Sequence, residues 1–235
     1  MIVAIDGPAG SGKSTTARAV ARQLGFLYVD TGAMYRTVAL ALSRARSDHP
    51  NVTVIDLIDD IDIQFSYAED PPRVFLNGDD VTEDIRTPDI SGLASTVAKE
   101  APVRAAMVVK QRDLANQVTS TGGGAVVEGR DIGTVVFPEA DLKVFLHARV
   151  DERARRRRLD LAQKGRDMPE EEVLRQLADR DSEDSSRAIA PLKAADDALH
   201  LDTTTLTFDE QVSRIVTWAL EIAAGRSPAK RKELV

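Results

Sequence analysis

The chain of 235 residues contains no cysteine, and this absence excludes disulfides, thiolate metal sites and a catalytic thiol. No apolar run approaches the roughly 18 residues that a membrane helix requires. The 3 histidines, at positions 49, 147 and 200, lack metal-ligand spacing and are interpreted as structural. A net charge of −7 argues against a general nucleic-acid binder. We therefore expect no nucleic-acid partner and no membrane partner, and a cytoplasmic location.

Arginine, by contrast, is concentrated in a few places. It gathers at 153–158 and at 180–187, and it occurs singly at positions 36, 104 and 130. A protein that is acidic overall but locally rich in arginine is suited to small anionic ligands. We expect one domain over residues 1–225, with no repeats, no signal segment before the first strand at Ile2, and a disordered tail over 226–235.

The segment Gly7–Ser14, GPAGSGKS, matches the P-loop pattern G-x-x-x-x-G-K-[ST] at every fixed position. A short apolar strand, Ile2–Ile5, precedes it, and a helical pattern that ends near Gly25 follows it. Glycines let consecutive backbone N–H groups point into one concavity at a helix N-terminus, which favours an anion. The alternative is a glycine-rich turn without a ligand. The residues expected to bind ATP here are Gly7, Pro8, Ala9, Gly10, Ser11, Gly12, Lys13, Ser14 and Thr15.

Further strands are predicted at 26–30, 125–127, 142–146 and 199–201, alternating with helices. These include a short helix over 52–60 capped by Asn51, helical residues 89–116 broken at Pro102, and a helix from Asp151 to about 165. A helix over 170–181 is followed by a polar loop over 180–187. The last helix opens with a capping box at Thr207–Glu210. Its inward face is expected to comprise Val212, Ile215, Val216, Ala219 and Leu220. The pattern predicts an α/β fold with a doubly wound five-stranded parallel sheet.

Residues 63–82 differ from this alternation. Two short strands and an Asn77-Gly78 turn predict a small antiparallel β insert. Periodicity leaves open whether the insert closes over a substrate or is only a decoration.

A second candidate site follows the strand at 125–127. Glu128-Gly129-Arg130-Asp131-Ile132-Gly133 places charges and glycines at the carboxyl end of a strand, where ligands of α/β sheets bind. A solvated loop is the alternative. Asp30 and Thr31 end another strand at the same edge. Arg36, early in the following helix, could face either a ligand or solvent.

Four segments together resemble the bacterial cytidylate kinases: Ile5–Pro8, Asp30–Arg36, Gly129–Pro138 and Arg187–Leu192. The resemblance extends from Ile5 to about Val216. It implies a P-loop kinase whose core comprises residues 1–62, 83–150 and 188–225, with an acceptor-binding β insert at 63–82. The arginine-rich region 151–187 would form a helical lid that closes over the triphosphate and excludes water.

The resemblance also implies roles for single residues. Cytosine would be contacted by Thr31, Ser95, Arg104 and Asp131. The acceptor phosphate would be bound by Arg36 and Arg130. Arg180 and Asp184 would reach the sugar, with Arg180 and Arg187 also near phosphate. In the lid, Arg156 and Arg157 are the arginines expected at ATP. Lys13, Arg130 and Arg187 would stabilise the transferring phosphoryl group, and Ser14 would bind Mg²⁺.

The expected reaction is Mg²⁺-dependent phosphoryl transfer from ATP to CMP or dCMP by a monomeric enzyme. Glu128 stands where the family more often has Asp, which leaves its part in Mg²⁺ binding open. Residues 182–186 are poorer in arginine than in some relatives. Two rivals remain: a P-loop kinase for another small acceptor, such as UMP, AMP or shikimate, and a regulator that holds ATP without transferring phosphate.

Overall fold

The computed structural model describes residues 1–163 and 165–228. Lys164, near the expected end of one helix, and most of the predicted tail, residues 229–235, lie outside this range. The chain divides into two units, each of which is described by itself. The first unit contains Met1–Val29 and the chain from Arg112 onward, and the second contains Asp30–Gln111.

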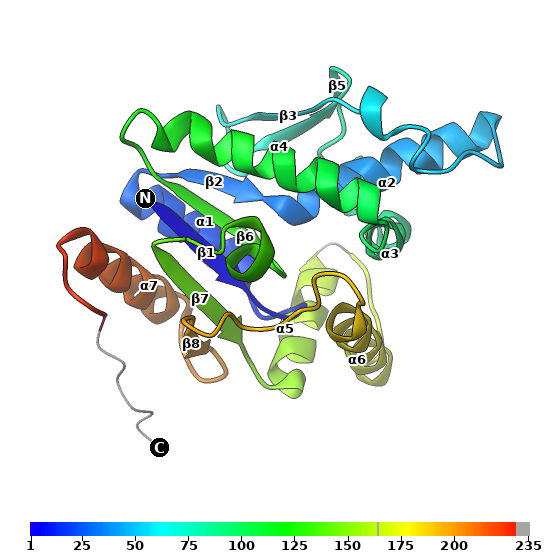
Figure 1. Cartoon of the computed structure of the whole chain (residues 1–235). Coiled ribbons are helices and arrows are strands. Elements are labelled where there is room, and N and C mark those ends of the chain that lie inside the picture. The colour runs from blue at the N-terminus through cyan, green and yellow to red at the C-terminus, as the bar shows by residue number, and fades with distance from the viewer. Residues whose placement is uncertain (164, 229–235) are drawn as a thin grey trace. The chain divides into compact units, whose positions relative to one another are not determined.

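The first unit is built on a five-stranded parallel sheet with the strand order β2-β6-β1-β7-β8 (Figure 1). The strands are β1 (Ile2–Asp6), β2 (Leu27–Asp30), β6 (Ala125–Gly129), β7 (Leu142–His147) and β8 (Leu199–Asp202). The central strand β1 pairs with β6 on one side and with β7 on the other, both in parallel. The predicted α/β fold with five parallel strands is confirmed.

Helices α1 (Lys13–Leu24) and α7 (Phe208–Ala223) pack against each other in the first unit. Their apolar side chains share a core with Val3, Ile5 and Val144 of the sheet. Gly25 has a positive φ of 67° and caps α1, as predicted, and the capping box Thr207–Glu210 opens α7. One position was wrong: Leu220 is 56% exposed, because the buried stripe of α7 follows Val212, Ile215 and Ala219 and turns away from the next residue.

Helices α5 (Val150–Gln163) and α6 (Glu170–Ser186) also pack against each other, around Ala154, Leu161, Val173 and Leu177. The predicted polar loop over 180–187 was wrong, because α6 continues to Ser186. The segment Ser182–Ser186 is polar but holds no glycine or proline that would end a helix, and Asp184 is anchored by two arginines. Arg180 and Asp184 therefore project from a helix.

The second unit combines helices with the predicted antiparallel insert. It contains α2 (Thr31–Asp48), α3 (Pro88–Val97), and the first part of α4 (Ala101–Thr119), which continues into the first unit. Its small sheet has the order β3 (Ile63–Ser66), β4 (Arg73–Leu76) and β5 (Asp79–Asp80). The turn residues Asn77 and Gly78 have φ values of 50° and 91°, as a tight hairpin turn requires.

The short helix expected over 52–60 is absent from the second unit. Only a 3₁₀ turn, η1 (Ile58–Asp60), forms there. The carboxylate of Asp56 accepts bonds from the backbone N–H of Thr53, at 2.9 Å, and from its hydroxyl, at 2.6 Å. These local bonds satisfy the groups that a helix would have used, so Asn51 caps no helix. A second 3₁₀ turn, η2, spans Asp84–Arg86.

Gly7 is the residue where the fold tolerates no side chain. Its φ is +153°, and a Cβ atom there would lie 2.0 Å from the carbonyl oxygen of Leu146 on β7. We expect Gly7→Ala to lower the free energy of unfolding by about 3 kcal/mol, because the neighbouring atom is backbone and cannot move aside cheaply. Urea unfolding measures the change. Gly92→Ala is the matched control: it lies in α3 with open space around its Cβ, so the same substitution should be neutral or slightly stabilising. Equal unfolding midpoints for both variants would contradict the expectation.

Candidate active site

The P-loop connects β1 to α1 and leaves the start of α1 open to an anion. Gly12, the N-cap residue, has a φ of 91° and offers no side chain to the free N–H groups of the first turn. No acidic residue lies in that turn. Unpaired N–H groups and the positive end of the helix dipole therefore remain available to a phosphate.

Lys13 lies buried beside this loop, with only 5% of its surface exposed. Its Nζ donates to the carbonyl oxygen of Pro8 at 2.7 Å and lies 3.5 Å from the Ser11 hydroxyl. Burial, and after it the charge of Arg130, lowers the pKa of Lys13 to about 7, although Glu128 acts in the opposite direction. The ammonium is thus held where its charge is poorly compensated, and an arriving phosphate would supply the missing counter-charge.

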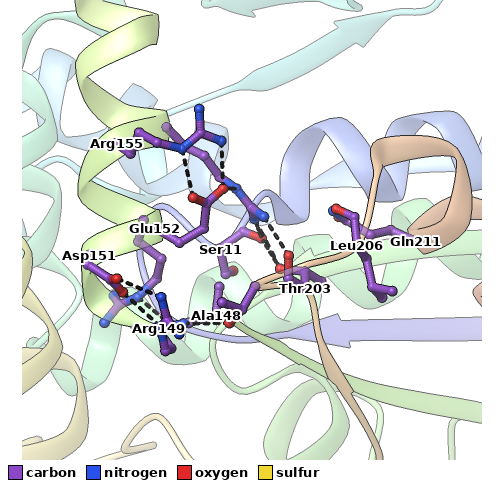
Figure 2. Close-up of polar contacts among 12 residues, drawn as sticks. Ser11, Ala148, Arg149, Asp151, Glu152, Arg155, Thr203, Leu206 and Gln211 are labelled. Atoms are coloured by element: carbon purple, nitrogen blue, oxygen red, sulfur yellow. Dashed lines mark hydrogen bonds and ion pairs between the residues drawn. The ribbon is translucent and has the colours of Figure 1, made fainter.

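Arg156, one of the two lid arginines predicted at ATP, supports the P-loop from α5. Its Nη1 donates to the carbonyl of Ser11 at 3.3 Å and to the hydroxyl of Thr203 at 3.0 Å, and its Nη2 donates to the carbonyl of Thr203 at 2.5 Å. Glu152, one helical turn earlier, pairs with its Nε at 2.8 Å. Figure 2 shows Ser11, Thr203 and Glu152 in this cluster. Arg157, by contrast, is exposed.

Arg153 was missed as a site residue, because it was read as one member of an arginine run. It is only 7% exposed, and its guanidinium donates to the carbonyl of Ala9 at 3.0 Å and to that of Ala148 at 3.1 Å. It also pairs with Asp181 of α6 at 2.6 Å. One side chain therefore joins the P-loop to both α5 and α6. Helical periodicity does not single out Arg153 among its neighbours, because its burial depends on contacts with the P-loop and α6.

Thr203 and Gln211 were missed as well. Gln211 on α7 accepts from the hydroxyl of Thr16 at 3.2 Å and donates to the carbonyl of Leu206 at 3.1 Å, and both Thr16 and Gln211 are buried. No sequence pattern marks these residues, since their partners are distant in the chain.

A second cluster brings together residues predicted at the acceptor. Asp184 on α6 is 1% exposed; Nε of Arg130 donates to its Oδ2 at 2.7 Å, and Nη2 of Arg187 donates to its Oδ1. Burial raises the pKa of Asp184, but the charges of Arg130, Arg187 and Arg180 and the hydrogen bond from Arg130 together outweigh burial and hold the pKa below its usual value. Arg180 adds a third positive charge, which acts on both Asp184 and Lys13. The first unit thus gathers Lys13, Arg130, Arg180, Asp184 and Arg187 into one electropositive cluster.

The carboxyl end of β6 contributes two buried acids to this unit. Glu128 is 4% exposed and accepts from the hydroxyl of Tyr28 at 2.8 Å. Asp131 is 6% exposed. Asp6, which precedes the P-loop, accepts from the backbone N–H groups of Ile132 and Gly133. No sequence motif assigns Asp6 a role of its own.

The remaining predicted residues lie in the second unit. Thr31, Ser95 and Arg104 are all buried there. The guanidinium of Arg104 lies 5.8 Å from the ring centre of Tyr35, and it donates to the carbonyl of Ala98 at 3.2 Å. Arg36 pairs with Asp30 at 3.1 Å.

The side chains near the P-loop could bind Mg²⁺ only together with other ligands, such as phosphate oxygens and water. The described residues contain no group of three or more His, Cys, Asp or Glu side chains that could hold a metal ion. Mg²⁺ in nucleotide sites typically takes one or two protein ligands and completes its octahedron with phosphate oxygens and water. Ser14, exposed at the start of α1, offers such a single hydroxyl ligand. The residues present therefore fit Mg²⁺ bound together with a nucleotide.

A five-stranded parallel sheet that carries a P-loop, a buried P-loop lysine and a buried arginine–carboxylate cluster defines a P-loop kinase. The cytidylate kinase family model matches residues 3–221, and the chain belongs to this family of nucleoside monophosphate kinases. The expected family is thereby confirmed. Among the described residues, no helix is long and apolar enough to cross a membrane.

Two relatives illustrate the similarity. A cytidylate kinase from Bacillus cereus (strain G9842) is 47% identical over 216 residues, which cover 92% of this chain and 94% of the relative. A cytidylate kinase from Bacillus anthracis (strain CDC 684 / NRRL 3495) is 46% identical over 223 residues, covering 94% and 97%. Among solved structures, a gluconokinase from Sinorhizobium meliloti 1021 aligns with a TM-score of 0.45 and 15% identity, covering 95% of this chain and 93% of that one. We draw no conclusion about the reaction from a similarity this weak.

Proposed function

We propose that this chain transfers the γ-phosphoryl group of ATP to CMP and dCMP, forming ADP and CDP or dCDP. An oxygen of the acceptor phosphate forms the new bond to the γ-phosphorus, and the bond from that phosphorus to the β–γ bridging oxygen breaks, leaving ADP. The observation that carries the proposal is the cluster of the buried Lys13 and Asp184 with the partly buried Arg130 and Arg187 beside an open P-loop, in a chain of this family.

The proposed roles follow the charges of the site. Lys13 leaves its contact with the Pro8 carbonyl for the phosphates of ATP. Arg130 and Arg187 neutralise the transferring group, while Asp184 keeps their guanidiniums in place. Ser14 would hold Mg²⁺, which would neutralise charge on the β- and γ-phosphates. The enzyme would be monomeric and cytoplasmic, with one kinase domain over 1–225, an acceptor insert at 63–82 and a lid at 151–187.

Cytosine would be recognised through its 4-amino group. The oxygens of Asp131 and Ser95 would accept from this group, and Thr31 and Arg104 would complete the contacts. Uracil carries an acceptor at the same place, so it would leave these buried oxygens unpaired, which is a strong basis for rejection.

The test of the proposed function is ADP release with Mg-ATP against CMP, dCMP, UMP, AMP, GMP and shikimate. Turnover mainly with CMP and dCMP is the expected result. Preference for another acceptor would leave the P-loop assignment standing and reject the cytosine site. ATP binding without acceptor-dependent turnover would favour a regulator.

Asp131→Ala tests the cytosine contact directly. We expect kcat/KM to fall about 10- to 100-fold with CMP and much less with UMP, because one charged hydrogen bond to the amino group is lost. Steady-state kinetics with both acceptors measure the ratio. Asp113→Ala, which removes an exposed carboxylate from α4, should leave the ratio unchanged. Equal losses with the two acceptors would remove Asp131 from base recognition.

A further inference from the structure

The backbone that follows Arg130 and Asp131 forms a single π-helical turn, η3 (Ile132–Val136). The N–H of Val136 donates to the carbonyl of Asp131 at 3.2 Å, and the N–H of Phe137 donates to that of Ile132 at 2.7 Å. Both bonds span five residues, which defines the π geometry. Such turns are rare and occur frequently at functional sites.

The N-terminal end of η3 is held by Asp6. Its Oδ1 accepts from the N–H of Ile132 and its Oδ2 from the N–H of Gly133, each at 2.8 Å. Asp6 is only 5% exposed and ends β1, immediately before the P-loop. One carboxylate therefore connects the central strand to the first two residues of the turn.

The C-terminal end is held by Arg112 of α4. Its Nε donates to the carbonyl of Val136 at 2.8 Å, and its Nη2 donates to that of Val135 at 3.0 Å. An anion thus contacts the N–H groups at one end of the turn and a cation contacts the carbonyls at the other. This polarity matches the dipole of a helical turn, and all four bonds are charge-assisted.

Stability alone does not account for Asp6. Burial raises its pKa to about 6, against the opposing effect of its two backbone hydrogen bonds. An acid whose pKa is higher in the folded chain than in the unfolded chain binds protons more readily when folded. Folding stability therefore falls as the pH rises from the unfolded pKa near 3.8 to about 6, and the whole loss is present above that pH. A buried carboxylate that lowers folding stability is expected where it orders a functional segment.

We infer that Asp6 and Arg112 are positioning residues, which hold η3 from its two ends and thereby fix the backbone that presents Arg130 and Asp131. This inference rests on the proposed function, in which Arg130 binds the acceptor phosphate and Asp131 binds the acceptor base. Neither Asp6 nor Arg112 needs to touch a substrate.

The test uses Asp6→Asn and Arg112→Gln in the full chain. Asparagine keeps one acceptor oxygen, but its NH2 group cannot accept the bond from Gly133. Glutamine is uncharged and offers one nitrogen in place of the two that contact the carbonyls. We expect the KM for CMP to rise at least tenfold and the preference for CMP over UMP to fall severalfold. The KM for ATP should change by less than about twofold in Arg112→Gln. Arg112→Lys, which retains one charged donor, should recover part of the loss.

Two matched controls remove a charge of the same kind elsewhere. Asp141 accepts from the N–H of Ile2 at 2.6 Å, at the start of β1. Arg46 donates to the carbonyl of Val52 at 3.2 Å. Asp141→Asn and Arg46→Gln should leave both KM values and the acceptor preference unchanged.

Amide hydrogen exchange provides a readout that does not depend on turnover. Protection of residues 132–137 should fall in Asp6→Asn and Arg112→Gln, while the amides of β1 stay protected. Unchanged protection and an unchanged KM for CMP would overturn the inference, as would equal changes in the KM values for CMP and ATP in Arg112→Gln. Failure of the proposed function would show differently, as wild-type enzyme without CMP-dependent ADP release, and the exchange experiment would still decide whether the two side chains hold η3.

Discussion

Replacing Lys13 with alanine is expected to lower kcat by at least about a thousandfold while leaving the chain folded. The transferring phosphoryl group carries spread negative charge, and phosphoryl-transfer enzymes work mainly by positioning and neutralising it. Lys13 is the P-loop cation, and it lies buried where its charge acts through a medium of low polarity. Its only described hydrogen-bond acceptors are the Pro8 carbonyl and the Ser11 hydroxyl, so removing it leaves no buried carboxylate that depended on it for a hydrogen bond.

The lowered pKa of Lys13 adds a second signature. A lysine with a pKa of about 7 in the folded chain and an ordinary value near 10.5 in the unfolded chain holds fewer protons when folded between these values. Stability therefore rises with pH across that range. Bound triphosphate favours the charged ammonium, so ATP binding near pH 7.5 should take up a fraction of a proton. Calorimetry with Mg-ATP in buffers of different ionisation enthalpy measures this uptake, and Lys13→Ala should lose it.

Lys193→Ala provides the control for the loss of one positive charge. Lys193 is exposed in the same unit, so its removal should leave both kcat and proton uptake close to wild type. Near-wild-type turnover of Lys13→Ala would contradict the P-loop assignment. A large change in its urea unfolding midpoint would instead show that the lysine serves the fold.

The sheet and the P-loop were predictable because their signals are local. The apolar strand Ile2–Ile5, the glycines and the helix behind them are contiguous, and the pattern G-x-x-x-x-G-K-[ST] has one well-defined geometry. The hairpin at Asn77-Gly78 was predictable for the same reason, since both residues accept a positive φ.

What could not be predicted depends on pairs of residues that are distant in the chain. The π-helical turn η3 is bound at one end by Asp6, more than 120 residues earlier, and at the other by Arg112. The continuation of α6 to Ser186 accompanies the burial of Asp184 against Arg130. Arg153 looked like its neighbours in an arginine run, and only the packing of α5 on α6 separates it from the exposed Arg157. The hydrophobic periodicity of the sequence carries no information about such long-range pairs.

Asp184→Ala is expected to have the second large effect, on stability and activity together. The substitution leaves the guanidiniums of Arg130 and Arg187 without their shared carboxylate, and Arg187 has only 7% of its side chain exposed. Removing one partner of a buried ion pair typically lowers the free energy of unfolding by about 3–5 kcal/mol, because the remaining charge stays buried without compensation. Turnover should also fall, since both arginines are proposed to hold phosphate. Chemical unfolding and steady-state kinetics measure the two effects.

Anions and pH should affect Asp184→Ala differently from the wild type. With the carboxylate gone, the arginines form a site with excess positive charge, so sulfate or inorganic phosphate should raise the unfolding midpoint of Asp184→Ala more than that of the wild type.

The pKa of Asp184 lies below its usual value in the folded chain. The stabilisation of the fold by the ionised Asp184 carboxylate is therefore complete above the ordinary aspartate pKa and is lost as the pH falls through the lower folded value. The stability difference between wild type and variant should therefore stay constant from about pH 5 to pH 8 and shrink in stronger acid. Asp84→Ala is the control, because this exposed acid pairs with the exposed Arg44 at the surface, where a pair contributes about 1 kcal/mol or less. If sulfate stabilised wild type and Asp184→Ala equally, Asp184 would not be the group that balances the two arginines, and the charge assignment of the acceptor site would have to be changed.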